Sequence, residues 1–227
     1  MKPPPRVRAD ELLDAPRHDP AELRRSLEQV AGVNRWLGGI RALKRHLAGL
    51  DGDGPRVLLD VGAGNGAVAE AVAGWAGGGR TPWRVVALDV HPQIVPLAAE
   101  RTRVEAVRGD ALRLPFPDGA FDAAYTVLTL HHFEGDDAVR VVAEMARVSR
   151  GLVLVNDLER TRLAHLGARL LAATVWRGNR LTRHDGPLSV LRSFTPAELL
   201  DVGRRAGLHD VRVRRHAPFR LVLEGRG

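Results

Sequence analysis

Three alternating glycines give the sequence its clearest sign of chemistry. Residues 58–73 read LLDVGAGNGAVAEAVA, in which an apolar run ends at Asp60 and Gly62, Gly64 and Gly66 follow. Small apolar residues then repeat at helical spacing. Glycine tolerates positive φ, and the free amides of a helix N-terminus can face a ligand that approaches the backbone closely. The stretch therefore predicts a strand, a tight turn and a helix that together bind a ligand.

Acidic residues near the turn narrow the choice of ligand. Asp89 ends the next apolar run, 23 residues beyond Gly66, which is a suitable distance for a carboxylate that binds a ribose diol. Asp60 stands directly before the turn, where its charge disfavours a pyrophosphate and suits an ammonium or sulfonium group. Asp110 and Ala111 follow a third apolar run and offer an acceptor and an amide donor to adenine. We therefore favour a nucleoside with a cationic group. The same glycines also fit a dinucleotide fingerprint, so an NAD(P) oxidoreductase stays an alternative.

The elements that must position these residues follow an alternating order. Apolar runs at 56–61, 83–90, 104–110, 121–130 and 151–157 predict strands, and helical patterns at 66–76, 91–102 and 136–149 separate them. Such an order is typical of a parallel sheet covered on both faces. The last two runs, HDVRVRRH and FRLVLEG, are joined by only two residues, which requires an antiparallel pair.

The regions outside this alternation predict a cap and a lid. Residues 1–18 should form a loose tail, and a helix should begin at Asp19–Pro20 and end at Gly32, with a second helix at 33–50 and a turn at 51–55. We therefore divide the chain into a tail and helical cap at 1–54 and a ligand-binding domain at 55–227. After the fifth strand, 158–176 predicts a helix and 176–194 an irregular stretch, and together 158–194 would form a lid. Thr195 and Glu198 predict the start of another helix.

Taken in order, these motifs resemble the class I S-adenosylmethionine-dependent methyltransferases. The resemblance is carried by LLDVGAGNG, ALDV, GDALRLPFPDGAFDAAYT and LTLHHF, and it is strongest with the small-molecule branch of quinone and polyketide pathways. It implies an α/β, Rossmann-like sheet of seven mostly parallel strands with an antiparallel last strand and helices on both faces. It also implies S-adenosylmethionine as the cofactor. The residues we assign to cofactor binding are Asp60, Gly62, Ala63, Gly64, Gly66, Asp89, Val90, Asp110, Ala111 and Thr126.

Histidines supply the candidates for a catalytic base. Methyl transfer to a hydroxyl needs an aligned acceptor and a group that removes its proton. His131 and His132 follow the fourth strand, and His184, beside Asp185 in a loop flanked by glycines, is a second candidate. The residues we expect to line the acceptor pocket are Trp36, Trp176, Asp185 and Phe194. A metal site at His131, Asn156 and Asp157 lacks convincing ligand spacing, so we predict no metal.

The composition of the chain limits its expected location and partners. The 227 residues carry a net charge of +7 and no cysteine, and neither a signal-like N-terminus nor a run of apolar residues long enough to span a membrane is present. We expect a cytoplasmic protein, a monomer or homodimer, without a nucleic-acid partner, because no basic stripe is interleaved with aromatic residues.

The leading hypothesis is an S-adenosylmethionine-dependent methyltransferase for a small aromatic, phenolic or polyketide-like acceptor, with O-methylation favoured. Three alternatives remain beside the oxidoreductase. They are C-methylation of a quinone-type precursor, methylation of RNA or protein, and a partner protein that binds S-adenosylmethionine without catalysis.

Overall fold

A single mixed sheet runs through the computed structural model, which describes residues 2–50, 55–76 and 83–227. Its seven strands lie in the order β3-β2-β1-β4-β5-β7-β6. The strands are β1 (Val57–Val61), β2 (Arg84–Asp89), β3 (Val104–Arg108), β4 (Phe121–Val127), β5 (Ser149–Leu158), β6 (His209–His216) and β7 (Arg220–Arg226). Strands β1 to β5 are parallel, and β7 is antiparallel to both β5 and β6. The predicted fold class is confirmed.

Helices cover both faces of this sheet. The helices are α1 (Pro20–Trp36), α2 (Gly39–Leu47), α3 (Ala67–Ala76), α4 (Val95–Ala99), α5 (Gly135–Val148), α6 (Arg162–Ala173), α7 (Arg180–Arg192) and α8 (Pro196–Arg205). Short 3-10 helices lie at η1 (Leu12–Asp14), η2 (Ala48–Leu50) and η3 (Leu130–His132). In the part of the chain that the structure describes, no helix is long and apolar enough to cross a bilayer.

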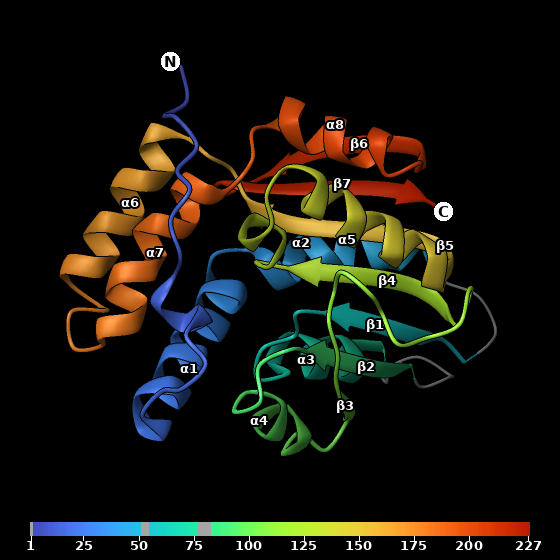
Figure 1. Cartoon of the computed structure of the whole chain (residues 1–227), viewed down its shortest axis with the longest axis horizontal. Helices are drawn as coiled ribbons and strands as arrows, with labels where there is room; N and C mark the ends of the chain where they lie inside the picture. Colours follow the sequence, from blue (N-terminus) through green and yellow to red (C-terminus); the bar gives the residue numbers. More distant parts are fainter. Residues whose placement is uncertain (1, 51–54, 77–82) are drawn as a thin grey trace.

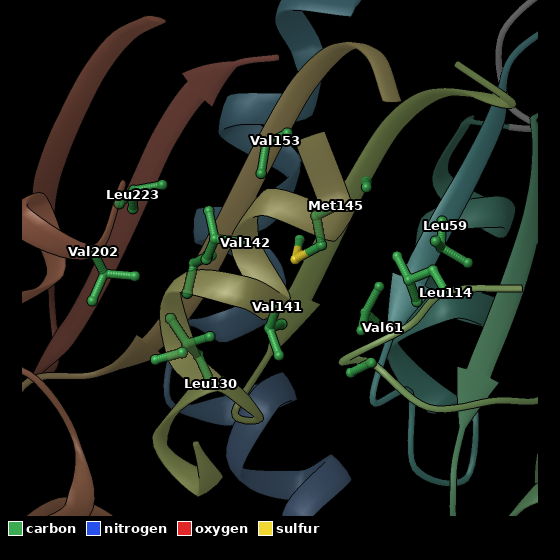
Figure 2. Close-up of a cluster of buried hydrophobic side chains, with 14 of the residues drawn as sticks. Leu59, Val61, Leu114, Leu130, Val141, Val142, Met145, Val153, Val202 and Leu223 are labelled. Carbon is green, nitrogen blue, oxygen red and sulfur yellow. The ribbon is translucent and has the colours of Figure 1, made fainter. Parts of the chain in front are cut away.

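The core is divided between the two faces of the sheet. On one face, α5 and α8 bury Val141, Met145 and Val202 against strand residues such as Leu59 and Val153 (Figure 2). On the other face, leucines and alanines of α2 and small residues of α3 pack against the same strands. Burial of these side chains stabilises the sheet by roughly 1.5–3 kcal/mol for each large apolar residue. The strands that carry the glycine turn and the acids are therefore held rigidly at their centres.

A second layer of elements stands at the carboxyl ends of the parallel strands. Helices α1, α6 and α7 lie there, and the N-terminal segment runs past α7 (Figure 1). Open α/β sheets bind ligands at this edge. The arrangement places the predicted cap and lid next to each other, beside the glycine turn.

Several predicted boundaries at the N-terminus are wrong. Helix α1 begins at the expected cap, Asp19, but continues past Gly32 to Trp36, and the second helix begins only at Gly39. Gly38, with φ of 80°, supplies the turn between the two helices. The tail is not loose, because Arg6 donates to two carbonyl oxygens and Glu11 is 5% exposed. The predicted turn at 51–55 lies almost entirely outside the described residues.

The predicted irregular stretch at 176–194 is also wrong, because it contains helix α7. Asn179 caps this helix by accepting hydrogen bonds from the amides of Leu181 and Thr182. Gly186 lets it approach Trp176, since a Cβ at Gly186 would lie 2.4 Å from the indole ring. Tertiary packing thus forms a helix where Gly and Pro weaken the local pattern. The helix predicted from Thr195 is confirmed, with a complete capping box to Glu198.

Candidate active site

The glycine turn joins the end of β1 to α3 and is anchored on β2. The amides of Gly62 and Ala63 both donate to the Leu88 carbonyl oxygen, at 2.8 and 2.9 Å. Gly62 has φ of 71°, and a Cβ there would lie 2.2 Å from Cγ2 of Thr129. Gly64 has φ of 55°, but only Leu27 lies within 4 Å of its missing Cβ, at 3.8 Å. Gly62 is therefore required for packing, whereas Gly64 leaves space for a ligand.

Asp89 fixes the shape of this turn from the end of β2. Its Oδ2 accepts a hydrogen bond from the Gly64 amide at 2.9 Å, and its Oδ1 accepts one from the His91 amide at 2.9 Å. Each carboxylate oxygen has further lone pairs for a ribose hydroxyl. The same side chain can thus orient the turn and bind a diol.

Asp60 is a buried acid with an unused oxygen. It is 1% exposed, and its Oδ2 has no hydrogen-bond partner. Burial raises the pKa of Asp60 to about 8, and the charge of Asp89 adds to this effect. The Tyr125 hydroxyl is near enough to lower the pKa, although it lies outside hydrogen-bonding geometry. A cation bound beside Asp60 would favour the ionised carboxylate.

These residues line a cavity of about 390 Å³. Of the predicted cofactor residues, those that line it are Asp60, Gly62, Ala63, Gly64, Asp89, Val90, Asp110 and Ala111. Gly66 and Thr126 are not in the lining. Thr126 is buried and donates to the Val61 carbonyl oxygen at 2.7 Å, so its hydroxyl supports the strand behind the turn.

A second cavity, of about 380 Å³, adjoins the first. Leu13, Val30, Leu128 and His132 line both cavities. The rest of its wall comes mainly from α1, α6 and α7, and most of that wall is apolar. A volume in this range suits a small organic molecule.

The predicted acceptor residues are divided by the structure. Trp176 and Asp185 line the second cavity. Trp36 is 77% exposed and Phe194 is 2% exposed, and neither lines this cavity. The Phe194 ring instead packs beneath Arg6, whose guanidinium carbon lies 4.2 Å from the ring centre.

The predicted histidines also differ in position. His131 and His132 both line the second cavity, and His132 lines the first as well. His184 lines neither cavity; its side chain is 48% exposed and pairs with Asp185 at 2.8 Å. It lies on α7 and not in the predicted loop.

His131 lies between two buried carboxylates. Its Nδ1 is 2.8 Å from Oδ1 of Asp157, and its Nε2 is 3.4 Å from Oε1 of Glu11. Burial lowers the pKa of His131, but Asp157 and Glu11 outweigh burial and raise the pKa to about 10. The imidazoles in turn hold the pKa values of Glu11 and Asp157 below their usual range, despite burial. With no ion bound, the two carboxylates thus favour the imidazolium form of His131, which makes it a poor proton acceptor.

Two residues in the wall of the second cavity were missed by the sequence analysis. Glu11 lies in a segment predicted to be loose, and Arg220 begins the last strand. Arg220 is fully buried, donates to Asn34 Oδ1 at 2.9 Å, and has a pKa lowered by burial to about 10. A single charged residue in a polar or strand-like stretch carries no sequence signal of burial.

Comparison with known proteins now adds to this geometry. A family model described as a methyltransferase domain matches residues 59–154, which hold most of β1, the glycine turn, β2 to β4 and much of β5. Residues 59–154 thus match a methyltransferase domain, in agreement with the resemblance carried by the sequence motifs.

Individual relatives agree with this assignment of the methyltransferase domain. A demethylmenaquinone methyltransferase of Thermobifida fusca is 29% identical over 145 residues, which is 58% of each chain. Another, of Deinococcus radiodurans, is 36% identical over 100 residues, 41% of this chain and 39% of its own. The matched region thus spans 58% of the length of the first relative and 39% of the length of the second.

The fold is also shared with a solved structure. Human N-acetylserotonin methyltransferase in complex with S-adenosylmethionine superposes with a TM-score of 0.69, covering 97% of this chain and 60% of that one, at 17% identity. At this identity the likeness concerns the fold alone.

The residues of the first cavity fit S-adenosylmethionine, which is the cofactor of this domain class. The unpartnered Oδ2 of Asp60 suits the cationic methionine end, and the open side of Gly64 leaves room beside it. Asp89 stands at the end of β2, where it suits a ribose, and Asp110 and Ala111 follow β3 at the far side of the cavity.

Proposed function

We propose that the protein transfers a methyl group from S-adenosylmethionine to a small aromatic, phenolic or polyketide-like acceptor, with oxygen as the favoured methylated atom. The observation that carries the proposal is the junction of the two cavities. The first is lined by the residues assigned to the cofactor, and the second is mostly apolar and of a size for a small molecule. Methyl transfer requires donor and acceptor to meet in line, as two adjoining cavities allow.

The chain's own residues have distinct roles in this proposal. When bound, S-adenosylmethionine supplies an electrophilic methyl group on a sulfonium sulfur. Asp60 and the glycine turn would hold the methionine end, Asp89 the ribose, and Asp110 with Ala111 the adenine. The apolar wall of the second cavity would exclude water and orient the acceptor. Of the three histidines considered as bases, His132 is the one that lines both cavities, so it is best placed to take a proton from the acceptor hydroxyl.

C-methylation of a quinone-type precursor is the second candidate. It is favoured by the two curated relatives, which are named demethylmenaquinone methyltransferases. Mass spectrometry and carbon NMR of the methylated product would distinguish the two, because a methyl carbon on oxygen resonates apart from one on carbon.

Calorimetric titration with S-adenosylhomocysteine tests the cofactor assignment first. We expect saturable binding to the wild type and a Kd at least about tenfold higher for Asp89→Ala, because a partly buried, charge-assisted acceptor is lost. Asp201→Ala, an exposed acid on α8, is the matched control and should bind like the wild type. Preferential binding of NAD(H) in a parallel titration would refute the proposal and restore the oxidoreductase alternative.

Gly167 on α6 tests the acceptor cavity separately. It lines the second cavity, and no atom lies within 4 Å of its missing Cβ. We expect Gly167→Leu to fill the cavity and to raise the KM for a phenolic acceptor by about tenfold or more, with unchanged affinity for S-adenosylhomocysteine. Gly167→Ala, which adds one methyl group, is the control. Equal turnover by both variants would place the acceptor elsewhere.

A further inference from the structure

Glu11, His131 and His132 bring three potential metal ligands together at the junction of the cavities. Glu11 comes from the N-terminal segment, and both histidines come from η3, directly after β4. Nε2 of His131 lies 3.4 Å from Oε1 of Glu11, and Nε2 of His132 lies 3.8 Å from Oε2. One ligand atom from each residue lies within 4.8 Å of the other two. Among the described residues, no other group of three histidine, aspartate or glutamate side chains has its ligand atoms this close together.

The distances between the Glu11 carboxylate oxygens and the two imidazole nitrogens are more typical of ligands around a shared metal ion than of direct hydrogen bonds. Ligands at about 2.0–2.1 Å from a tetrahedral zinc ion are separated from one another by roughly 3.3 Å. Good hydrogen bonds between nitrogen and oxygen are shorter, at about 2.7–3.2 Å. The 3.4 and 3.8 Å distances from the Glu11 carboxylate to the two imidazoles therefore leave space for an ion between them.

Each histidine is also oriented from behind by a carboxylate. Nδ1 of His131 is 2.8 Å from Oδ1 of Asp157, whose Oδ2 accepts a hydrogen bond from the His131 amide at 3.0 Å. Nδ1 of His132 is 3.0 Å from Oδ1 of Asp14. Metal-binding histidines commonly donate their second ring N–H to a carboxylate in this way, which fixes the tautomer and directs Nε2 at the ion. The pattern occurs here twice, on neighbouring ligands.

We propose that Glu11, His131 and His132 bind a zinc-class divalent transition-metal ion and leave one coordination position open to the acceptor cavity. Two histidines and a glutamate form a donor set that suits zinc in sites with an open position. All three residues line the second cavity, and His132 also lines the first. The site differs from the sequence-based expectation of no metal, since its third ligand lies in the segment expected to be loose.

The open position gives the site a role in acceptor recognition, and this part rests on the proposed function. An oxygen of the acceptor that coordinates the ion would be held at the junction of the two cavities. Coordination lowers the pKa of a bound hydroxyl, so its proton can pass to solvent at neutral pH. With the ion in place, His132 would therefore serve as a ligand, and its role as a base would apply only to the metal-free protein. We therefore infer that acceptors with a hydroxyl or phenol oxygen are preferred over purely hydrocarbon ones.

Metal titration tests the site without any measurement of activity. The full-length protein is treated with a chelator, dialysed and titrated with Zn²⁺ by calorimetry, and with Co²⁺ by visible absorption. We expect one tight equivalent of Zn²⁺ and the intense d–d bands of a low-coordinate Co²⁺ site. His132→Ala should weaken Zn²⁺ binding by about 100-fold or more, and Asp14→Asn by about tenfold through His132. His209→Ala, an exposed histidine on β6, is the matched control.

The outcomes separate this proposal from the assignment of the cofactor. His132 is only partly buried and Asp14 is partly exposed, so their variants should fold, and melting curves with and without Zn²⁺ check this. Zn²⁺ should raise the Tm of the wild type but not that of His132→Ala. Absence of a saturable equivalent, or equal Zn²⁺ affinity in the wild type and His132→Ala, would overturn the metal site even if S-adenosylhomocysteine binds normally. Loss of S-adenosylhomocysteine binding with intact Zn²⁺ binding would instead refute the proposed function.

Discussion

Asp60 illustrates how a single residue can reduce stability at a binding site. Its folded-state pKa is raised to about 8, mainly by burial, from an ordinary value of 3.8. A raised pKa means that the folded state favours the protonated form. The protonated carboxyl makes its full contribution to the free energy of unfolding below about pH 4, and this contribution is lost as the pH rises through about 8. In the absence of a cation, the ionised carboxylate therefore destabilises the fold.

The first prediction concerns Asp60→Asn, which keeps the shape of the side chain but cannot ionise. At pH 8–9 we expect the variant to be more stable than the wild type by about 1–3 kcal/mol, because a buried unpaired charge is removed. At about pH 4 the two proteins should be nearly equal in stability, because Asp60 is then largely protonated in the folded state and little is lost on unfolding. Urea denaturation at both pH values measures the difference, and a variant less stable than the wild type at pH 9 would contradict the assignment of a raised pKa.

The same variant should bind S-adenosylmethionine more weakly, because the ionised carboxylate attracts its cationic groups. Binding to the wild type at pH 7 should also release a proton from Asp60, as the cation lowers its pKa. Calorimetry in two buffers with different ionisation enthalpies detects this proton. Identical binding enthalpies in the two buffers would show that Asp60 does not change its protonation state.

At the scale of elements, the glycine turn contains two glycines with different constraints. Gly62 and Gly64 both have positive φ, so alanine is strained at either position. At Gly62 the added Cβ would also collide with Thr129, whereas at Gly64 the nearest atom is 3.8 Å away. An alanine at Gly64 would therefore suffer backbone strain alone, whereas an alanine at Gly62 would suffer both backbone strain and a steric clash.

The second prediction follows from this difference. Gly62→Ala should lower the free energy of unfolding by about 2–4 kcal/mol, and Gly64→Ala by about 1–2 kcal/mol. Thermal or urea unfolding measures both. Gly64→Ala should nonetheless weaken S-adenosylhomocysteine binding, because its methyl group points into the cavity. Equal stability of the two variants would mean that the β1–α3 turn can move away from Thr129.

The elements also show what sequence can and cannot predict. Strands β1 to β5 were predicted because continuous apolar runs record burial on both faces of a sheet. Asp60, Asp89 and Asp110 were predicted because each one directly follows or ends such a run. Helix α7 was missed because Gly186 and Pro187 interrupt its helical pattern, and its stability comes from an Asn179 cap and from contact with Trp176. Helix packing of this kind depends on residues distant in sequence.

At the scale of the whole molecule, the N-terminal segment joins parts of the fold that are far apart in sequence. Asp185 on α7 accepts hydrogen bonds from the amides of Leu12 and Leu13, at 2.8 and 3.0 Å. At its other end, the Ala15 carbonyl oxygen is 3.0 Å from Nε2 of His91, beside β2. The segment therefore crosses both cavities and brings Leu13 to their shared wall. Its Pro- and Arg-rich composition gave no sign of this position, because isolated buried residues form no periodic pattern.

The third prediction is that Asp185 holds this segment closed. Asp185→Ala leaves the amides of Leu12 and Leu13 without acceptors, so the segment should open more often while the sheet stays folded. Hydrogen exchange at these two amides should become at least about tenfold faster, and S-adenosylhomocysteine should dissociate faster because Leu13 and Asp14 line its cavity. Asp201→Ala on α8 is the control. Unchanged exchange at Leu12 and Leu13 would show that the remaining contacts suffice. Faster exchange with an unchanged dissociation rate would show that the ligand leaves by another route.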